Sequence, residues 1–399
     1  MNIRTLALLP IVVLLVSLVS QLLVYLIPYS RLQIYTFNSF VIVISLFIMS
    51  IVPFSVGVLI SGFLVFKDGV IKRVDFIQKD FEYKKAISVL WVLTVIMILV
   101  AALNIVRFGL PPFLTAAMGL QSKYNYLNYG FFKYPLFASA MGIIMISVFH
   151  IKKRILFISV VIMSVMTLVL FVSRGFLIQG ILQFFFLYIY RHRLKFNRKL
   201  ILKVSSFIII IIILFGLWGD VRSGSEVFLS VMEIKRSYQF VPTLFLWFFS
   251  YLSLPLSNMI VIIQNFHHLY LGAMTLSSSL PPIMVEIFHI STFDSLYNPV
   301  DAIFSSPLNN MATAAAIPYL DFGWVGVALY YFIIGVTSGY VNFKSIARRK
   351  PLYQAINAII LSSIALSFFW NMMINITIIT EIILILSLFR FRFGSFKVI

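Results

Sequence analysis

The chain has 399 residues, of which 61% are hydrophobic and only 11% are charged. A soluble globular domain is about half apolar and about a quarter charged, so this composition excludes a soluble fold. The apolar runs are long and continuous, which predicts an all-α polytopic membrane protein rather than a transmembrane β-barrel. There are no cysteines, so disulfides, thiolate nucleophiles and cysteine metal sites are excluded.

Ten apolar runs predict spans, although several are short of the usual length. The first run follows one arginine and lacks a small-residue cleavage site, so we interpret it as a retained span. A further apolar piece, 241–263, is interrupted by Pro242 and Pro255. We expect a re-entrant or interfacial helix there, or one of a pair of crossings, which makes 10–12 spans in all. The ten runs are 6–27, 41–66, 86–105, 134–150, 155–172, 175–190, 200–218, 324–341, 353–369 and 372–388.

Basic residues are distributed unequally between the two sides of the predicted bundle. If the N-terminus lies inside, 23 Lys and Arg residues fall in inside segments and 8 in outside segments. Short basic loops remain on the cytoplasmic side, so both termini are predicted to be cytoplasmic. The net charge of +19 is explained by this bias and by anionic lipid, and we predict no nucleic-acid partner.

Residues 219–323 form a stretch of 105 residues between two spans, on the outer side. Connections of this length are usually functional or separately folded. We therefore divide the chain into N-terminal helices at 1–218, a long outer segment at 219–323 and C-terminal helices at 324–399. The outer side carries acidic residues as well as lysines and arginines, so the functional site is expected on that face.

Basic side chains at the outer ends of spans are candidate ligands for a phosphate group. Arg174 lies in a Ser-Arg-Gly turn, where Gly175 exposes backbone N–H groups at the start of the next helix. Arg222 follows another span, and together with Lys235 and Arg236 it is expected to bind a diphosphate, because a guanidinium pairs with phosphate at two points. The alternatives are contact of Arg174 with lipid phosphates and pairing of Arg222 with Asp220, Glu226 or Glu233.

A general base is expected among the outer histidines and carboxylates. Glu286 and His289 share one face if their segment is helical, and His267 and His268 are the other outer histidines. Surface positions without a catalytic role are the alternative for each, and the remaining outer carboxylates include Asp294, Asp301 and Asp321. Glu381 lies within a span, either as a functional group or as hydrogen-bonded support between helices. No metal motif occurs, so neither a metal nor another cofactor is predicted.

Three local patterns together resemble the bacterial O-antigen polymerases of the Wzy type. They are the run 170–175 ending in Ser173-Arg174-Gly175, the sequence Gly219-Asp220-Val221-Arg222, and Pro318-Tyr319-Leu320-Asp321-Phe322-Gly323 with Gly326. The layout of spans around one long periplasmic segment is similar over nearly the whole chain, whereas the motifs cover about twenty residues.

The resemblance implies a metal-independent glycosyltransferase in the bacterial inner membrane. Its substrate would be an oligosaccharide repeat unit on undecaprenyl diphosphate, polymerised into O-antigen of lipopolysaccharide or into capsule. A hydroxyl of one unit would attack the anomeric carbon of another, and undecaprenyl diphosphate would leave. The lysine and arginine side chains of the outer face would stabilise that diphosphate, and an outer histidine or carboxylate would act as the general base that takes the proton. A chain-length regulator and a flippase of the same pathway would be its protein partners.

Two other functions remain open at this point. An O-antigen ligase, which transfers the finished chain to the lipid A core, would use the same chemistry and a similar layout. A lipid-linked oligosaccharide flippase, which is a transporter, would be expected to have paired halves, charges along a central cavity and short loops. The one long outer segment and the single intramembrane acid favour the polymerase over the flippase.

Overall fold

A computed structural model of the protein describes residues 6–67, 78–118, 132–150, 154–171, 173–192, 224–266, 268–288, 290, 312–348 and 350–390, with isolated residues between 206 and 220. In these residues all regular structure is helical, apart from one isolated bridge between Ser30 and Ile234. The predicted all-α class is therefore confirmed for the described part of the chain.

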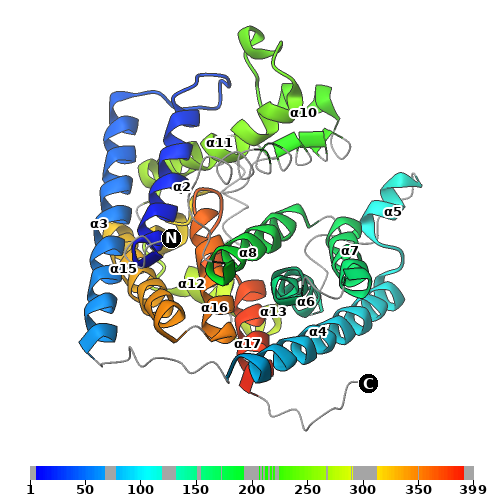
Figure 1. The fold of residues 1–399 in the computed structure, drawn as a ribbon. Coiled ribbons are helices and arrows are strands. Elements are labelled where there is room, and N and C mark those ends of the chain that lie inside the picture. The colour runs from blue at the N-terminus through cyan, green and yellow to red at the C-terminus, as the bar shows by residue number, and fades with distance from the viewer. Residues whose placement is uncertain are drawn as a thin grey trace. The chain divides into compact units, whose positions relative to one another are not determined.

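The helices follow the predicted apolar runs closely in most places (Figure 1). The first half of the chain forms α2 (Leu9–Tyr25), α3 (Phe37–Lys67), α4 (Gln78–Phe108), α5 (Pro112–Ala117), α6 (Lys133–Ile146), η1 (Ser147–His150), α7 (Arg154–Leu170) and α8 (Arg174–His192). The second half forms α10 (Ser225–Val231), η2 (Arg236–Tyr238), α11 (Thr243–Asn265), α12 (Ala273–Ser279), α13 (Pro282–Ile287), α15 (Ala316–Arg348), α16 (Pro351–Ala365), η4 (Met372–Ile374) and α17 (Ile376–Arg390).

Four helices are long and apolar enough to cross a membrane by themselves, among the residues that the structure describes. Their apolar portions are Phe37–Val65, Lys85–Phe108, Thr243–Asn265 and Ala316–Arg348. Four shorter apolar helices are Leu9–Tyr25, Lys133–Phe149, Phe157–Leu170 and Pro351–Ala365. These helices identify a membrane protein. Most of the predicted span 200–218 lies outside the described residues.

The chain forms two compact units, each assembled from segments far apart in sequence. The first comprises residues 1–61, 194–339 and 363–372, and the second comprises residues 62–193, 340–362 and 373–399. Helices α3 and α15 each continue from the first unit into the second. Since neither unit is continuous in sequence, each one depends on helices from both halves of the chain.

In the first unit, α3 and α15 approach each other through glycines. A Cβ added to Gly335 would lie 2.2 Å from the Phe54 carbonyl oxygen, and one added to Gly57 would lie 2.5 Å from the Phe332 carbonyl oxygen. Ser61 donates its hydroxyl hydrogen to the Val336 carbonyl across the same contact, at 2.6 Å. Such close backbone approach through small residues is the usual way in which helices associate within a bilayer.

Helix α15 is kinked near its start. Phe322 and Gly323 have non-helical backbone angles, and Gly323 has a φ of 61°, a conformation that glycine adopts without strain. A Cβ on Gly326 would lie 2.1 Å from the Pro318 carbonyl oxygen, so the turn before the kink packs on the turn after it. The motif 318–326 is thus a bent helix start, and α15 begins eight residues before the predicted span at Trp324.

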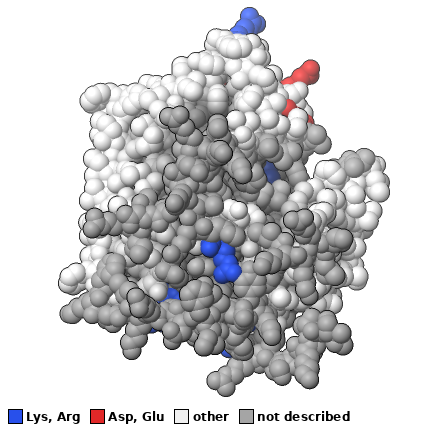
Figure 2. Space-filling model, viewed as in Figure 1, with Lys and Arg blue, Asp and Glu red and all other residues white. Residues whose placement is uncertain are grey.

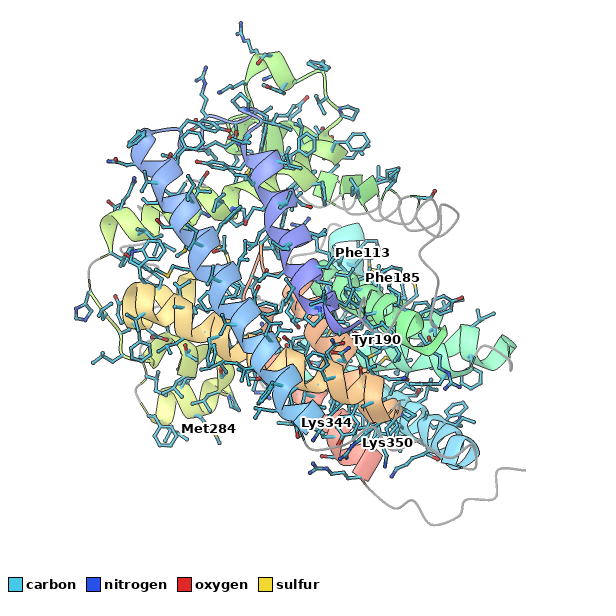
Figure 3. The ribbon with its side chains drawn as sticks, turned by 60° about the vertical axis from the view of Figure 1, so that its left-hand side comes forward. Phe113, Phe185, Tyr190, Met284, Lys344 and Lys350 are labelled. Carbon is cyan, nitrogen blue, oxygen red and sulfur yellow. The ribbon has the colours of Figure 1, made fainter. Side chains whose placement is uncertain are left out.

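Helix α11 covers the apolar piece 241–263 and is continuous, because Pro242 precedes it and Pro255 is accommodated within it. It packs against α2. Figures 1 and 3 both show it lying across α2 near the C-terminal end of that helix, rather than alongside it. Helix α11 is also one of the four helices that are long and apolar enough to cross a membrane.

The second unit is built around α6. Twelve of its fourteen residues are buried, including the small side chains Ala138, Ser139 and Ala140. Helices α4, α7, α8 and α17 all contact it. Gly142 lies against side chains of α4 and α17, and Gly180 of α8 lies against the backbone of Met141. Small residues on every face allow α6 to be enclosed on all sides, which explains why its apolar run has no polar face.

Candidate functional site

The connection after α2 is joined to the segment after α10 by backbone hydrogen bonds. Arg31 donates its N–H to the Glu233 carbonyl at 3.1 Å, and Lys235 donates its N–H to the Tyr29 carbonyl at 2.9 Å. The Ser30 hydroxyl also donates to the Met232 carbonyl at 2.7 Å. These bonds join the two segments, which the charge distribution predicts to lie on the same side of the membrane.

A buried aromatic cluster lies beneath this joint. The rings of Phe228 and Trp247 stack with their centroids 4.1 Å apart, and Tyr29 packs in the same cluster. The Tyr29 and Ser253 hydroxyls are hydrogen-bonded at 2.6 Å. Burial raises the pKa of Tyr29, so this phenol stays neutral. The cluster anchors α10 and α11 to the chain at the C-terminal end of α2.

Asp220, from the second motif, is held by the first turns of α11. The Thr243 hydroxyl donates to one carboxylate oxygen at 2.5 Å, and the Trp247 indole N–H donates to the other at 2.9 Å. A Cβ on Gly219 would lie 2.5 Å from the Trp247 ring, so only glycine allows this approach. Gly219 and Asp220 therefore have a structural role, while Arg222 lies outside the described residues.

Replacing Asp220 with alanine is expected to loosen the attachment of α11. The change removes two hydrogen bonds and leaves the partly buried Trp247 N–H without its acceptor, at a cost of about 1–3 kcal/mol. Thermal unfolding of the purified protein in detergent should show a lower midpoint for Asp220→Ala. The exposed Glu226, in neighbouring α10, provides the control, and Glu226→Ala should unfold like the parent protein. Equal midpoints for the two variants would contradict this role.

Lys235 and Arg236 lie at the start of η2, in a projection that extends beyond the C-terminal end of α2. Arg236 is exposed and Lys235 is half-buried, and neither makes an ion pair with any residue that the structure describes. Phe240, four residues further on, is 82% exposed. Figure 2 shows a basic side chain at the tip of this projection, with acidic side chains on its flank. The projection therefore combines adjacent cations with an exposed aromatic ring.

Arg174 is the first residue of α8, in the second unit. The turn before it is closed by a hydrogen bond from the Ser173 N–H to the Leu168 carbonyl at 2.8 Å. The side chain is half-buried, and its Nη1 atom is buried. The Ser-Arg-Gly turn thus separates α7 from α8, as the sequence predicts, and Arg174 occupies a helix N-terminus.

The candidate bases are less well placed. Glu286 is exposed in the last turn of α13, which ends at Ile287, two residues before His289. The expected helical face shared by Glu286 and His289 is therefore not continuous, because the helix ends between them. His268 is exposed, with its ring 5.2 Å from that of Tyr270. His267 and His289 themselves lie outside the described residues.

Glu381 lies in the core of the second unit. It is fully buried in α17, and the Gln183 amide of α8 donates to its Oε2 at 2.8 Å. One turn earlier, the Gln179 amide donates to the Ser362 hydroxyl at 2.8 Å. The sequence reasoning missed Gln179 and Gln183, although two amides spaced by four residues in an apolar helix predict one polar face. The contact with Gln183 supports the reading of Glu381 as a hydrogen-bonded link between helices.

Asp321, from the third motif, is the most extensively bonded carboxylate in the described part of the chain. It is fully buried and accepts hydrogen bonds from the N–H groups of Met274 and Thr275, both at 2.9 Å, and from the Thr275 hydroxyl at 2.6 Å. These donors belong to the first turn of α12, where a carboxylate is favourable. Asp321 thus fastens α12 to the bent start of α15 and is not an exposed base.

Among the described residues, no three His, Asp or Glu side chains lie together in a way that would hold a metal ion. Comparisons of the chain with protein-family models, with curated proteins and with solved structures give no match. A functional assignment therefore rests on the residues themselves and on the resemblance carried by the three motifs.

Proposed function

We propose that this protein polymerises oligosaccharide repeat units carried on undecaprenyl diphosphate, at the outer face of the bacterial inner membrane. The observation that supports the proposal is the adjacent pair of the half-buried Lys235 and the exposed Arg236, on a projection that is hydrogen-bonded to the chain just after α2. The headgroup region lies at that level, and the diphosphate of a lipid-linked donor lies in the same region. Cations at this height suit a diphosphate leaving group.

In the proposed reaction, a hydroxyl oxygen of the acceptor sugar forms a bond with the anomeric carbon of the donor sugar. The bond between that carbon and the diphosphate oxygen breaks, and undecaprenyl diphosphate leaves with the bonding electrons. Lys235 and Arg236 would stabilise the negative charge that develops on the diphosphate, with Arg222 and Arg174 as further candidates. An outer histidine or carboxylate would take the hydroxyl proton, and His268 and Glu286 are the candidates that the structure describes in exposed positions.

The finer topology belongs to the same proposal. Ten spans with both termini in the cytoplasm would place the joint between the α2 connection and Lys235 on the outer side. The 23-to-8 division of basic residues supports this orientation. Reporter fusions after residues 199 and 349 should then report the cytoplasm.

The proposed function is tested first by the surface polysaccharide of a strain that lacks the gene. Loss of a polymerase leaves a lipid A core capped by one repeat unit. Loss of a ligase or a flippase leaves no capped core. A gel that shows uncapped core alone would reject polymerisation in favour of one of these two alternatives.

The second test is neutralisation of the two adjacent cations, Lys235 and Arg236. Lys235→Gln with Arg236→Gln should shorten the polysaccharide ladder, because each charge-assisted bond to phosphate contributes about 1.5–3 kcal/mol, or about tenfold to a hundredfold in rate. Arg236→Lys should have a smaller effect, since it retains the charge but loses the two-point contact. The matched control is Arg390→Gln, another exposed arginine, at the end of α17. A normal ladder from the double variant, at normal protein level, would exclude these residues from diphosphate binding.

A further inference from the structure

Residues near the end of the long segment lie level with the middle of α2. The hydroxyls of Ser17 and Ser367 are hydrogen-bonded at 3.3 Å, and the Ala314 N–H donates to the Ser367 carbonyl at 2.8 Å. Ser17 is the central residue of α2, an apolar helix whose outward side chains include Val12, Val16, Val19 and Leu23. If α2 spans the bilayer, Ala314 lies near the bilayer centre.

The segment before α12 is fixed to the chain just beyond Ala314. The Tyr270 N–H donates to the Leu320 carbonyl at 3.0 Å, and the Leu271 N–H donates to the Asp321 carbonyl at 3.1 Å. The Asp321 carboxylate holds the first turn of α12, as described above. From Ala314 to Asp321 the chain makes a turn followed by six helical residues, which advance it by about 10 Å, whereas half the hydrocarbon thickness is about 15 Å. The start of α12 therefore falls within the hydrocarbon region.

The figures agree with this position of α12 and α13 along the spanning helices. Figure 1 and Figure 3 are related by a turn about the vertical axis, so heights can be compared between them. In both, these two short helices lie at the height of the C-terminal half of α3, well below its N-terminal end, and Met284 is labelled there in Figure 3. Residues that were expected in an outer loop thus reach far along a spanning helix of the same unit.

The surface of this segment is apolar. Leu271 is 75% exposed, Ile287 is 64% exposed and Phe288 is 65% exposed. From residue 268 to residue 288 the sequence contains one formally charged side chain, Glu286. An exposed apolar surface of this kind is unfavourable in water.

This surface continues onto the outward face of α15. Val325, Leu329 and Ile333 are exposed at four-residue intervals and so share one face. The two surfaces meet where the Phe322 ring lies 3.6 Å from the position of a Cβ on Gly272. Since an exposed apolar face of a long spanning helix contacts lipid, the continuous surface formed by residues 269–288 is expected to contact the same lipid.

We propose that residues 269–288 enter the bilayer and that α12 and α13 contact lipid acyl chains. Backbone polar groups in a bilayer must be bonded within the protein. Here the non-helical residues Tyr270 and Leu271 donate to α15, and Leu276 and Leu280 continue the hydrogen bonds of α12. The water-exposed part of the long segment is then limited, in the described residues, to the region of α10, η2 and the start of α11. The proposal does not depend on the polymerase function.

The test uses site-directed spin labels, because the chain has no cysteine to interfere. Leu271→Cys and Ile287→Cys would each carry a nitroxide in protein reconstituted into phospholipid vesicles. Val325→Cys, on the outward face of α15, is the lipid-facing control, and Phe240→Cys, on the projection, is the water-facing control. All four positions are exposed, so the labels should not disturb folding, and elution from a size-exclusion column checks this.

Relaxation of each label is measured with oxygen, which concentrates in lipid, and with a water-soluble nickel chelate. Labels at 271 and 287 should respond several-fold more strongly to oxygen than to the chelate, as the label at 325 does. The label at 240 should show the reverse ratio. A stronger response to the chelate at 271 and 287 would place the segment in water and overturn the proposal. A weak response to both reagents would place it against protein and would also overturn it.

Discussion

Replacing Asp321 with alanine is expected to cause the largest loss of stability among single changes in the first unit. The substitution removes the acceptor of three hydrogen bonds from Met274 and Thr275. Two of the donors are backbone N–H groups away from water, and an unsatisfied buried donor costs about 1–3 kcal/mol. The unfolding midpoint in detergent should therefore fall by an amount corresponding to about 3 kcal/mol or more.

Graded variants make this result specific to the hydrogen bonds. Asp321→Asn keeps one acceptor oxygen and should lie between alanine and the parent protein. Thr275→Val removes only the hydroxyl donor and should cost less than either. Glu286→Ala, on exposed α13, should leave the midpoint unchanged. If Asp321→Ala unfolded at the same temperature as Glu286→Ala, Asp321 would not have the structural role described here.

The second large effect is expected at the contact between α3 and α15. A methyl group at Gly335 would lie 2.2 Å from the Phe54 carbonyl oxygen, and the atoms that it meets are backbone rather than a movable side chain. The two helices must separate to admit it, which also stretches the bond between Ser61 and the Val336 carbonyl. Overpacking of this kind costs about 1–3 kcal/mol, and occasionally more. Gly335→Ala should therefore lower both the unfolding midpoint and the yield of folded protein.

Gly180→Ala is the matched control for this prediction. Gly180 is also a helical glycine facing another helix, but the nearest atoms to an added Cβ lie at 3.4 Å, an ordinary contact distance. The added methyl should be neutral or slightly stabilising there, because alanine favours the helix. Equal losses at positions 180 and 335 would show that helix contacts, rather than this particular close approach, determine the effect.

Membrane entry of residues 269–288 would change the list of candidate bases. Glu286 would lie among Met284 and Ile287 at lipid depth, where an aqueous acceptor sugar does not reach it. Asp321 is occupied by α12 in any case. His268, at the beginning of the segment, would then be the described candidate nearest to the outer surface.

The sequence by itself determined that this is a membrane protein, that its regular structure is helical, and approximately where most of the helices begin and end. Continuous apolar runs of spanning length permit only helices in a bilayer, so α3, α7 and α8 begin and end close to the predicted limits, whereas α4 begins eight residues before its predicted span. The Ser-Arg-Gly turn before α8 could also be predicted from the sequence, because an arginine and a glycine interrupt an apolar run. The same reasoning identified Lys235 and Arg236 as cationic residues in a mixed-charge segment, and their binding role stays a prediction.

Only the tertiary structure decided what the individual polar residues do. The sequence does not indicate the partners of Asp220, Asp321 and Glu381, yet each accepts hydrogen bonds from donors 20 or more residues away. The proposed membrane entry of residues 269–288 could likewise not be predicted from the sequence, because hydropathy depends on composition and not on the position of one segment relative to another helix. Such partners are set by how helices pack, and the pattern of a single segment contains no information about which donor will face it.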